Sequence, residues 1–317
     1  MTPIVSIIIP TIGREGFLTA AIESAVIAAR KVGIEGDSLE VIVIDDGEGG
    51  AAAEACKRVG TESRAQLRYV RSAKAPRGGA AAARNQGIRM ATADAIYLLD
   101  DDDKFLPNRF ETSLPLMRSG NFDVVLENAL REYVDGSGRP AYVTGPEDPA
   151  TNPFLMLISG NERSHVASGA TAFTKEVFLR TGGYDETLHD GEDGEFLCSL
   201  ALHGRVALVA GAPVTTISIH ADNSSRPDRR AYWKNVKALA RLHERMRGGT
   251  WPAEAAAVRD CICGKLDFAL TQYRKLSPSY WSRLSGGAKA LYYFPWDCMS
   301  INNAKSVVVW LVRRRES

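Results

Sequence analysis

The chain has 317 residues, of which 45% are hydrophobic, and its 39 basic and 38 acidic residues leave a formal net charge of +1. This length and apolar content suffice for one large core or two smaller ones. The balanced charge gives no support for bulk electrostatic binding to nucleic acid.

The N-terminal residues lead straight into an apolar strand pattern, without a basic region followed by a long apolar segment. We therefore expect no signal peptide. No window reaches about 18 uninterrupted apolar residues, so we also expect no membrane-spanning helix. The five cysteines are an odd number without zinc-finger spacing, and we expect reduced thiols. A cytoplasmic enzyme follows most simply.

Short apolar runs alternate with helical patterns over the first hundred residues. Continuous apolar runs predict buried strands at 5–9, 41–44, 67–70 and 95–99, and helical spacing predicts helices at 17–32 and 79–91. This alternation is typical of an α/β fold with a mainly parallel central sheet flanked by helices. We expect residues 1–104 to form a nucleotide-binding half.

The second half of the sequence has a mixed pattern. Strands are predicted at 122–127, 130–134, 168–174 and 206–209, with a helix at 191–203. We expect 105–228 to complete the same domain and 229–317 to form a helical C-terminal region. The tail at 304–315 combines apolar residues with three terminal arginines. It predicts either a helix packed on the core or peripheral contact with the inner face of a membrane.

Four consecutive aspartates, Asp100 to Asp103, follow the strand predicted at 95–99. Ligands of open α/β sheets bind at the carboxyl ends of strands, and Mg²⁺ often joins one or two carboxylates to substrate phosphates. The run therefore indicates a metal-held, phosphate-bearing substrate. The alternative is a solvated acidic turn before a helix, with Asp103 or Asn108 as its cap.

Two other strand ends carry polar side chains. Thr11 and Arg14 follow the first strand, where a hydroxyl and a guanidinium can contact a nucleotide and its phosphate. Asp45 and Asp46 end the second strand, where a carboxylate can accept from a base or a ribose. The alternative for this acidic pair is an Asx turn closed by Gly47.

The glycine- and alanine-rich segment 76–87 contains Arg77 and Arg84, whose guanidinium groups suit phosphate or a base carbonyl. Neither GxGxxG after the first strand nor GxxxxGK[ST] occurs. Their absence counts against a Rossmann dehydrogenase and a P-loop NTPase.

These segments occur in the order and spacing of family 2-type glycosyltransferases with the GT-A fold, which the chain resembles over about residues 4–222. The segments concerned are 5–14, 41–47, Arg84-Asn85-Gln86-Gly87 and 99–103. Gly182-Gly183-Tyr184-Asp185-Glu186 is similar to the family's GG[YF]DE segment, and 191–196 looks like its ED motif.

The resemblance implies a nucleotide-diphosphate-sugar donor, most often a UDP-sugar, and Mn²⁺ or Mg²⁺ as cofactor. The residues it assigns to the donor are Thr11, Arg14, Asp45, Asp46, Arg77, Arg84, Asp100 and Asp101. Those it assigns to the metal are Asp102, Asp103 and His220. The first choice for the direct ligand is Asp102, but a run of four leaves the register open. For His220 a purely structural role is the alternative.

Glu192 and Asp193 begin the helix predicted at 191–203. They could complement the helix dipole, or one could act as the general base that takes the acceptor's proton. Neighbouring helical residues point about 100° apart, so we expect only one to face the sugar. The resemblance favours Asp193, with Asp190 and Glu192 as alternates.

The resemblance thus implies an inverting, metal-dependent glycosyltransferase. Its acceptor would be a saccharide or a lipid-linked saccharide of polysaccharide, lipopolysaccharide or glycolipid synthesis. One alternative is a sugar-nucleotide nucleotidyltransferase, which the lack of lysine at 11–16 disfavours. Another is a non-catalytic nucleotide-sugar-binding protein, which the complete acidic set disfavours.

Overall fold

The computed structural model describes residues 2–48, 50–63, 65–73, 78–159, 163–188 and 191–220, together with 238, 241 and 242. The chain forms two compact units, of which the first comprises 1–187 and 196–222 and the second 188–195 and 223–317. Both sheets belong to the first unit. The division into 1–104, 105–228 and 229–317 stays a prediction.

A 7-stranded sheet forms the centre of the first unit, in the order β10-β6-β9-β4-β1-β2-β3. Its strands are β1 (Val5–Thr11), β2 (Leu39–Asp45), β3 (Gln66–Arg71), β4 (Ala95–Leu98), β6 (Val124–Leu126), β9 (Thr171–Thr174) and β10 (Val206–Leu208). The pairs β1–β2, β1–β4, β2–β3 and β6–β10 are parallel, as expected. Only β9 runs antiparallel to its neighbours β4 and β6.

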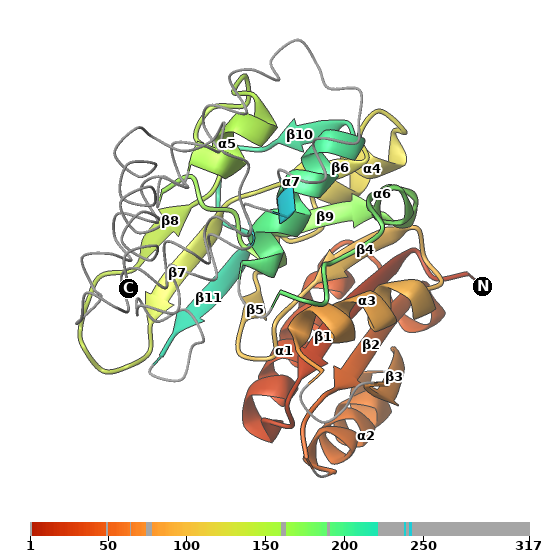
Figure 1. The fold of residues 1–317 in the computed structure, drawn as a ribbon. Coiled ribbons are helices and arrows are strands. Elements are labelled where there is room, and N and C mark those ends of the chain that lie inside the picture. Colours follow the sequence, from red (N-terminus) through yellow and green to blue (C-terminus); the bar gives the residue numbers. More distant parts are fainter. Residues whose placement is uncertain are drawn as a thin grey trace, which may run out of the picture. The chain divides into compact units, whose positions relative to one another are not determined.

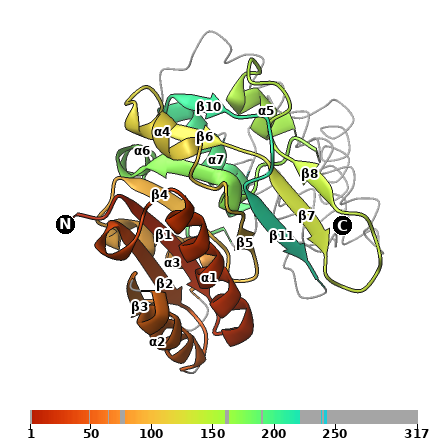
Figure 2. The same ribbon diagram turned by 180° about the vertical axis from the view of Figure 1, so that it is seen from behind.

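Seven helices are described: α1 (Glu15–Lys31), α2 (Ala51–Ser63), α3 (Ala80–Met90), α4 (Ser113–Arg118), α5 (Pro153–Ser159), α6 (Lys175–Thr181) and α7 (Glu192–His203). Side chains alternate along β1, so Ile7 and Ile9 pack with α1, α2 and α4 while Ile8 packs with α3 and α6. Figure 1 views the sheet from the side of α3, and Figure 2, from behind, shows α1 in front of the same strands. Helices therefore cover both faces, which explains why β1 and β2 are buried along their whole length.

Small residues let α3 approach the sheet closely. A Cβ added at Gly87 would lie 2.4 Å from Cγ2 of Ile8 and 3.2 Å from Cγ1 of Ile44. The small-residue segment before and within this helix is thus needed for packing, besides carrying Arg84.

A second, 4-stranded sheet has the order β5-β11-β7-β8, with β5 (Lys104–Phe105), β11 (Thr215–Ile219), β7 (Ala129–Tyr133) and β8 (Tyr142–Thr144). The sequence patterns missed β5 and β8, which have two and three residues, and also the helices α2, α4, α5 and α6. Three of these helices have seven residues or fewer, too short to show a helical period. Residues 168–170, expected as strand, form a 3-10 turn before β9.

Of the five cysteines, Cys56 and Cys198 lie in the described part and are buried thiols. Burial, with a contribution from the charge of Asp45, raises the pKa of Cys56 to about 12, so this thiol is unreactive. The tail at 304–315 lies outside the described residues.

Candidate active site

The aspartates after β4 alternate in exposure. The side chains of Asp100 and Asp102 are 32% and 13% exposed, whereas Asp101 is 4% exposed and Asp103 is buried. The solvated-turn alternative is wrong, because the run leads into β5 instead of a helix and Asp103 accepts a hydrogen bond from the backbone N–H of Ser218 at 3.0 Å. Asn108 does not cap a helix there but donates to the carbonyl of Pro213.

Arg14 supplies the positive charge that the acidic run requires. Its guanidinium donates to Asp101 through Nε, at 3.3 Å, and through Nη2, and its Nη1 lies 2.9 Å from Oδ2 of Asp102. Burial lowers the pKa of Arg14, but the hydrogen bond and charge of Asp101 outweigh that effect and raise it. The loop after β1 and the end of β4 therefore form one charge-paired cluster, as their places at the same edge of a parallel sheet predict.

The hydroxyl of Thr11 joins the same cluster. Its Oγ1 donates to Oδ2 of Asp101 at 2.6 Å and accepts from the backbone N–H of Gly13 at 3.0 Å. Gly13 has φ of +90°, a conformation that L side chains rarely adopt, so glycine is needed for this turn. Thr11 and Arg14 thus meet the acidic run, and both hold Asp101 in place.

Asp102 and His220 form a second pair. Nε2 of His220 lies 3.1 Å from Oδ2 of Asp102, and both side chains are largely buried. The antiparallel pairing of β11 with β5, which follows the aspartates directly, brings His220 to them. Burial and the charge of Asp100 raise the pKa of the Asp103 carboxyl well above its usual range, against the opposing effect of the Ser218 N–H.

Asp102 and His220 together offer two potential ligands to a divalent ion. Within the described residues, no group of three or more His, Cys, Asp or Glu side chains lies close enough to hold a metal ion. A carboxylate and an imidazole are both ligand types for such ions. This pair fits an ion that takes its remaining ligands from substrate phosphates and water.

Arg84 pairs with the outermost aspartate. Its Nη2 donates to Oδ1 of Asp100 at 2.6 Å, and its guanidinium carbon lies 5.5 Å from the centre of the Tyr184 ring. Arg84 itself is 3% exposed, so its charge is directed at the acidic run from α3. Asp100, with the larger exposed fraction, remains accessible beside it.

Asn85 carries out a role that the sequence did not reveal. Its amide nitrogen donates to the carbonyl of Tyr184 at 3.0 Å and to Oε1 of Glu186 at 2.9 Å, and its Oδ1 accepts from the N–H of Tyr184 at 2.9 Å. A Cβ at Gly183 would lie 2.6 Å from Oδ1 of Asn85. The segments 84–87 and 182–186, noted separately in the sequence, thus bind each other directly.

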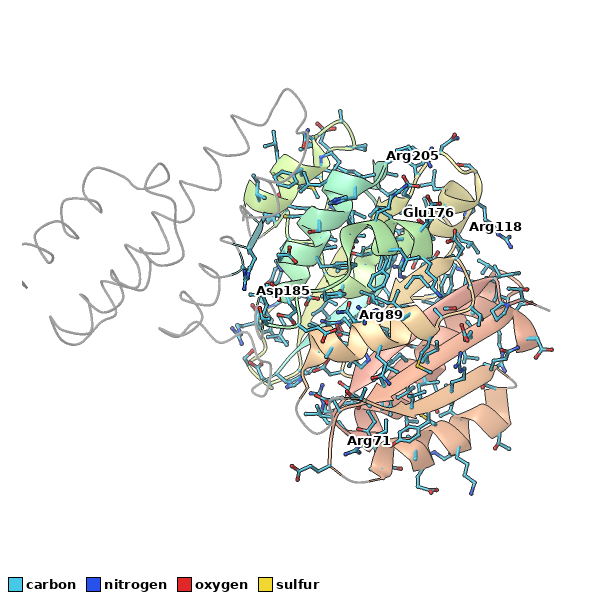
Figure 3. The ribbon with its side chains drawn as sticks, turned by 45° about the vertical axis from the view of Figure 1, so that its right-hand side comes forward. Arg71, Arg89, Arg118, Glu176, Asp185 and Arg205 are labelled. Carbon is cyan, nitrogen blue, oxygen red and sulfur yellow. The ribbon has the colours of Figure 1, made fainter. Side chains whose placement is uncertain are left out.

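Asp45 and Asp46 are engaged in local structure. Asp45 accepts from the N–H of Gly47 at 2.9 Å, which is the Asx-turn alternative, and from the hydroxyl of Tyr69 at 2.8 Å. It also faces Arg71 at the end of β3, whose side chain is labelled in Figure 3. Base recognition by this pair stays a prediction.

The loop before α3 is tied to the second strand end. Asp46 accepts from the backbone N–H groups of Gly78 and Gly79 at 2.9 and 2.7 Å. Arg77, expected to contact the donor, lies outside the described residues.

Glu192 and Asp193 lie in the first turn of α7, within the second unit. Their negative charges suit the N-terminus of a helix, which agrees with the alternative that they complement the helix dipole. Asp190 lies outside the described residues, and the choice of general base stays a prediction. The part of α7 in the first unit is anchored by Phe196, whose ring stacks on that of Tyr184 with centroids 4.0 Å apart.

Arg109 and Glu127 form a buried ion pair that the sequence did not reveal. Arg109 is fully buried, and its Nη1 donates to Oε2 of Glu127 at 2.5 Å and its Nη2 to the carbonyl of Thr171 at 2.8 Å. Its guanidinium carbon lies 4.6 Å from the Tyr97 ring centre and 5.2 Å from that of Phe105. Arg109 thus contacts β9 and β4 of the 7-stranded sheet and β5 of the 4-stranded sheet.

Across the described residues, every helix is too short or too polar to cross a membrane.

The chain was compared with known proteins. The model of glycosyl transferase family 2 matches residues 6–181, more than half of the chain. An uncharacterized glycosyltransferase of Haemophilus influenzae is 28% identical over 224 residues, which are 69% of this chain and 70% of that protein. The succinoglycan biosynthesis protein ExoU of Rhizobium meliloti is 31% identical over 182 residues, or 54% of this chain and 51% of that protein. The match thus spans about half the length of ExoU.

Solved structures show the same fold. S. aureus TarS 1–349, solved in complex with UDP-GlcNAc, matches with a TM-score of 0.68 and 15% identity, over 93% of this chain and 82% of that one. The mannosyltransferase PcManGT of Pyrobaculum calidifontis, solved with GDP-Man and Mn²⁺, matches with a TM-score of 0.53 and 15% identity, over 97% and 84%. The chain therefore belongs to glycosyl transferase family 2, and its fold is the GT-A fold of these transferase enzymes.

Proposed function

We propose that the protein transfers a sugar from a UDP-sugar to a hydroxyl of a saccharide or lipid-linked acceptor, with inversion at the anomeric carbon. The observation that carries this proposal is the cluster of Thr11, Arg14, Asp102 and His220 at the carboxyl edge of the central sheet. That edge is where open α/β sheets bind ligands. The UDP-GlcNAc complex of the similar TarS structure supports a uridine nucleotide as donor.

The donor's diphosphate would be bound by charge. Arg14 and Arg84 both point at the acidic run, and each would gain a further partner in the diphosphate oxygens. Asp102 and His220 would hold Mn²⁺ or Mg²⁺, with Asp103 as a less accessible alternative. When bound, the ion neutralises charge that develops on the departing diphosphate. The Mn²⁺ in the PcManGT complex supports this assignment.

Asp193 would take the proton of the attacking hydroxyl. A carboxylate can accept that proton while the acceptor oxygen attacks from the face opposite the diphosphate. A single displacement of this kind inverts the anomeric centre. The acceptor contacts are expected between residues 127 and 168, and the succinoglycan role of ExoU supports a polysaccharide pathway. Peripheral membrane contact through 304–315 stays a prediction.

The donor and metal assignments are tested by the thermal stability of the protein with UDP, with other nucleoside diphosphates and without ligand, each in Mn²⁺, Mg²⁺ or EDTA. A ligand at about 100 times its Kd adds about 2.7 kcal/mol to the free energy of unfolding. We expect UDP to stabilise the protein far more with Mn²⁺ or Mg²⁺ than with EDTA. Equal stabilisation in EDTA would refute the metal role, and a preference for another nucleoside diphosphate would refute the UDP assignment.

A further inference from the structure

Phe17 lies in the first turn of α1 and is 46% exposed. A single exposed apolar side chain is common on protein surfaces and needs no explanation by itself. This ring, however, has two specific neighbours. It stacks on the imidazole of His220 with centroids 5.7 Å apart and planes 14° apart, and the guanidinium carbon of Arg14 lies 5.6 Å from its centre.

Both neighbours of Phe17 also reach the same carboxylate oxygen. Nη1 of Arg14 lies 2.9 Å from Oδ2 of Asp102, and Nε2 of His220 lies 3.1 Å from that atom. The four side chains therefore form a closed ring of contacts, of which Phe17 is the only apolar member. It has no group that could bind a metal ion or a phosphate itself.

The orientation of the His220 ring is set by the side chains around it. The histidine comes directly after β11, and the torsion that rotates an imidazole about its Cβ–Cγ bond has broad energy wells. The contact with Asp102 holds one ring nitrogen, and a rotation about that contact would still change the plane of the ring. A nearly parallel aromatic neighbour restricts this rotation, because offset stacking limits the tilt of both rings.

We propose that Phe17 is a positioning residue that sets the plane of the His220 imidazole, so that Nε2 stays beside Oδ2 of Asp102 for metal binding. The inference rests on the metal role in the proposed function. It also carries a consequence for the choice of ion. Mg²⁺ takes oxygen ligands almost exclusively, whereas Mn²⁺ also accepts an imidazole nitrogen, so a well-oriented His220 should favour Mn²⁺ over Mg²⁺.

The first test needs neither metal nor nucleotide. NMR spectra of the histidine ring protons would be recorded for the wild type, Phe17→Leu, Phe17→Tyr and Ile27→Leu, with the His220 signal assigned by its loss in His220→Gln. Ile27 is a matched control, because it is an exposed apolar residue of the same helix. Loss of the ring current should move the His220 signal in Phe17→Leu alone. An unchanged signal in Phe17→Leu would overturn the proposal.

The second test measures the affinity for Mn²⁺ and for Mg²⁺ in the presence of UDP, with UDP binding in EDTA and the melting temperature as controls. We expect Phe17→Leu to weaken Mn²⁺ binding about two- to tenfold, the range of a paired aromatic contact. Mg²⁺ affinity, UDP binding in EDTA and the melting temperature should hardly change, and Phe17→Tyr should behave as the wild type.

The outcomes separate the two claims. If wild-type UDP binding does not respond to Mn²⁺, the metal role fails and this inference fails with it. If the wild type responds and Phe17→Leu binds Mn²⁺ equally well, only the positioning role of Phe17 is overturned. A parallel loss of Mn²⁺ affinity, EDTA-resistant UDP binding and melting temperature would also overturn it, since that pattern reports general damage to the fold.

Discussion

Charge removal at adjacent aspartates should separate stability from metal binding. Asp101 is 4% exposed and accepts hydrogen bonds from Thr11 and Arg14, whereas Asp102 is 13% exposed and contacts Arg14 and His220. Replacement by asparagine keeps the size of each side chain and removes its charge. The two substitutions should therefore affect different properties of the protein.

The magnitudes follow from the contacts. A hydrogen bond to a charged group contributes about 1.5–3 kcal/mol to stability. Asp101 accepts such bonds from the hydroxyl of Thr11 and from the partly exposed guanidinium of Arg14, which would still be paired with Asp102 in the variant. We expect Asp101→Asn to lower the free energy of unfolding by about 1–3 kcal/mol. For Asp102→Asn we expect about 1 kcal/mol or less, because relief of repulsion within the acidic run offsets the lost ion pair.

Metal-dependent UDP binding should respond in the opposite order. Asp102→Asn removes the charged ligand of the proposed ion and should weaken Mn²⁺-dependent binding at least roughly tenfold, or about 1.4 kcal/mol. Asp101→Asn should retain most of the increase in UDP affinity that Mn²⁺ produces. Urea unfolding gives the stabilities and calorimetric titration of UDP with Mn²⁺ or EDTA gives the affinities. Asp94→Asn, an exposed aspartate before β4, serves as the control.

Asp102 would not be the metal ligand if Asp101→Asn abolished the Mn²⁺-dependent increase in UDP affinity while Asp102→Asn retained it. That result would mean that the metal register of the run is shifted by one residue. Loss of the gain in both variants at unchanged stability would mean that burial does not distinguish their roles.

Three further substitutions test other parts of the account. Asp193→Asn should lower turnover roughly 10²-fold or more with little change in UDP affinity, and Glu192→Gln should lower turnover less. Near-normal turnover in Asp193→Asn would mean that another residue is the general base. Asp123 accepts from Arg205 (labelled in Figure 3) at 3.0 Å from both Nε and Nη2, which lowers its pKa to about 2. The stability that this ion pair contributes is present above the unfolded pKa of about 3.9 and is lost as pH falls through about 2. Asp123→Asn should therefore lower the free energy of unfolding by about 1–2 kcal/mol at pH 7 and by progressively less between pH 4 and pH 2. Urea unfolding over that pH range measures this difference. Gly87→Ala should lower the free energy of unfolding by about 1–2 kcal/mol, because the cost of overpacking against β1 exceeds the gain in helix propensity. A rise in stability would contradict the close approach of α3 to the sheet.

Local sequence patterns were sufficient to predict the parallel strands and flanking helices of the central sheet. Continuous apolar runs such as 5–9 and 41–44 have to be buried on both faces, which predicts parallel strands between helices. Because ligands of open α/β sheets bind at the carboxyl ends of the strands, the polar residues after these runs were candidates for the binding site. The structure brings Thr11, Arg14 and the four aspartates together.

The tertiary structure alone decided how those residues divide their roles. Four identical aspartates carry no local signal of direction, yet Asp101 and Asp103 are buried against β1 and β11, whereas Asp100, which Arg84 of α3 contacts, and Asp102 are more accessible. Likewise the antiparallel β9 and the contact of Phe17 with His220 depend on segments far apart in the chain. The sequence determined which side chains reach the edge of the sheet, through short-range hydrophobic periodicity. Their orientation there depends on long-range packing, which no local pattern encodes.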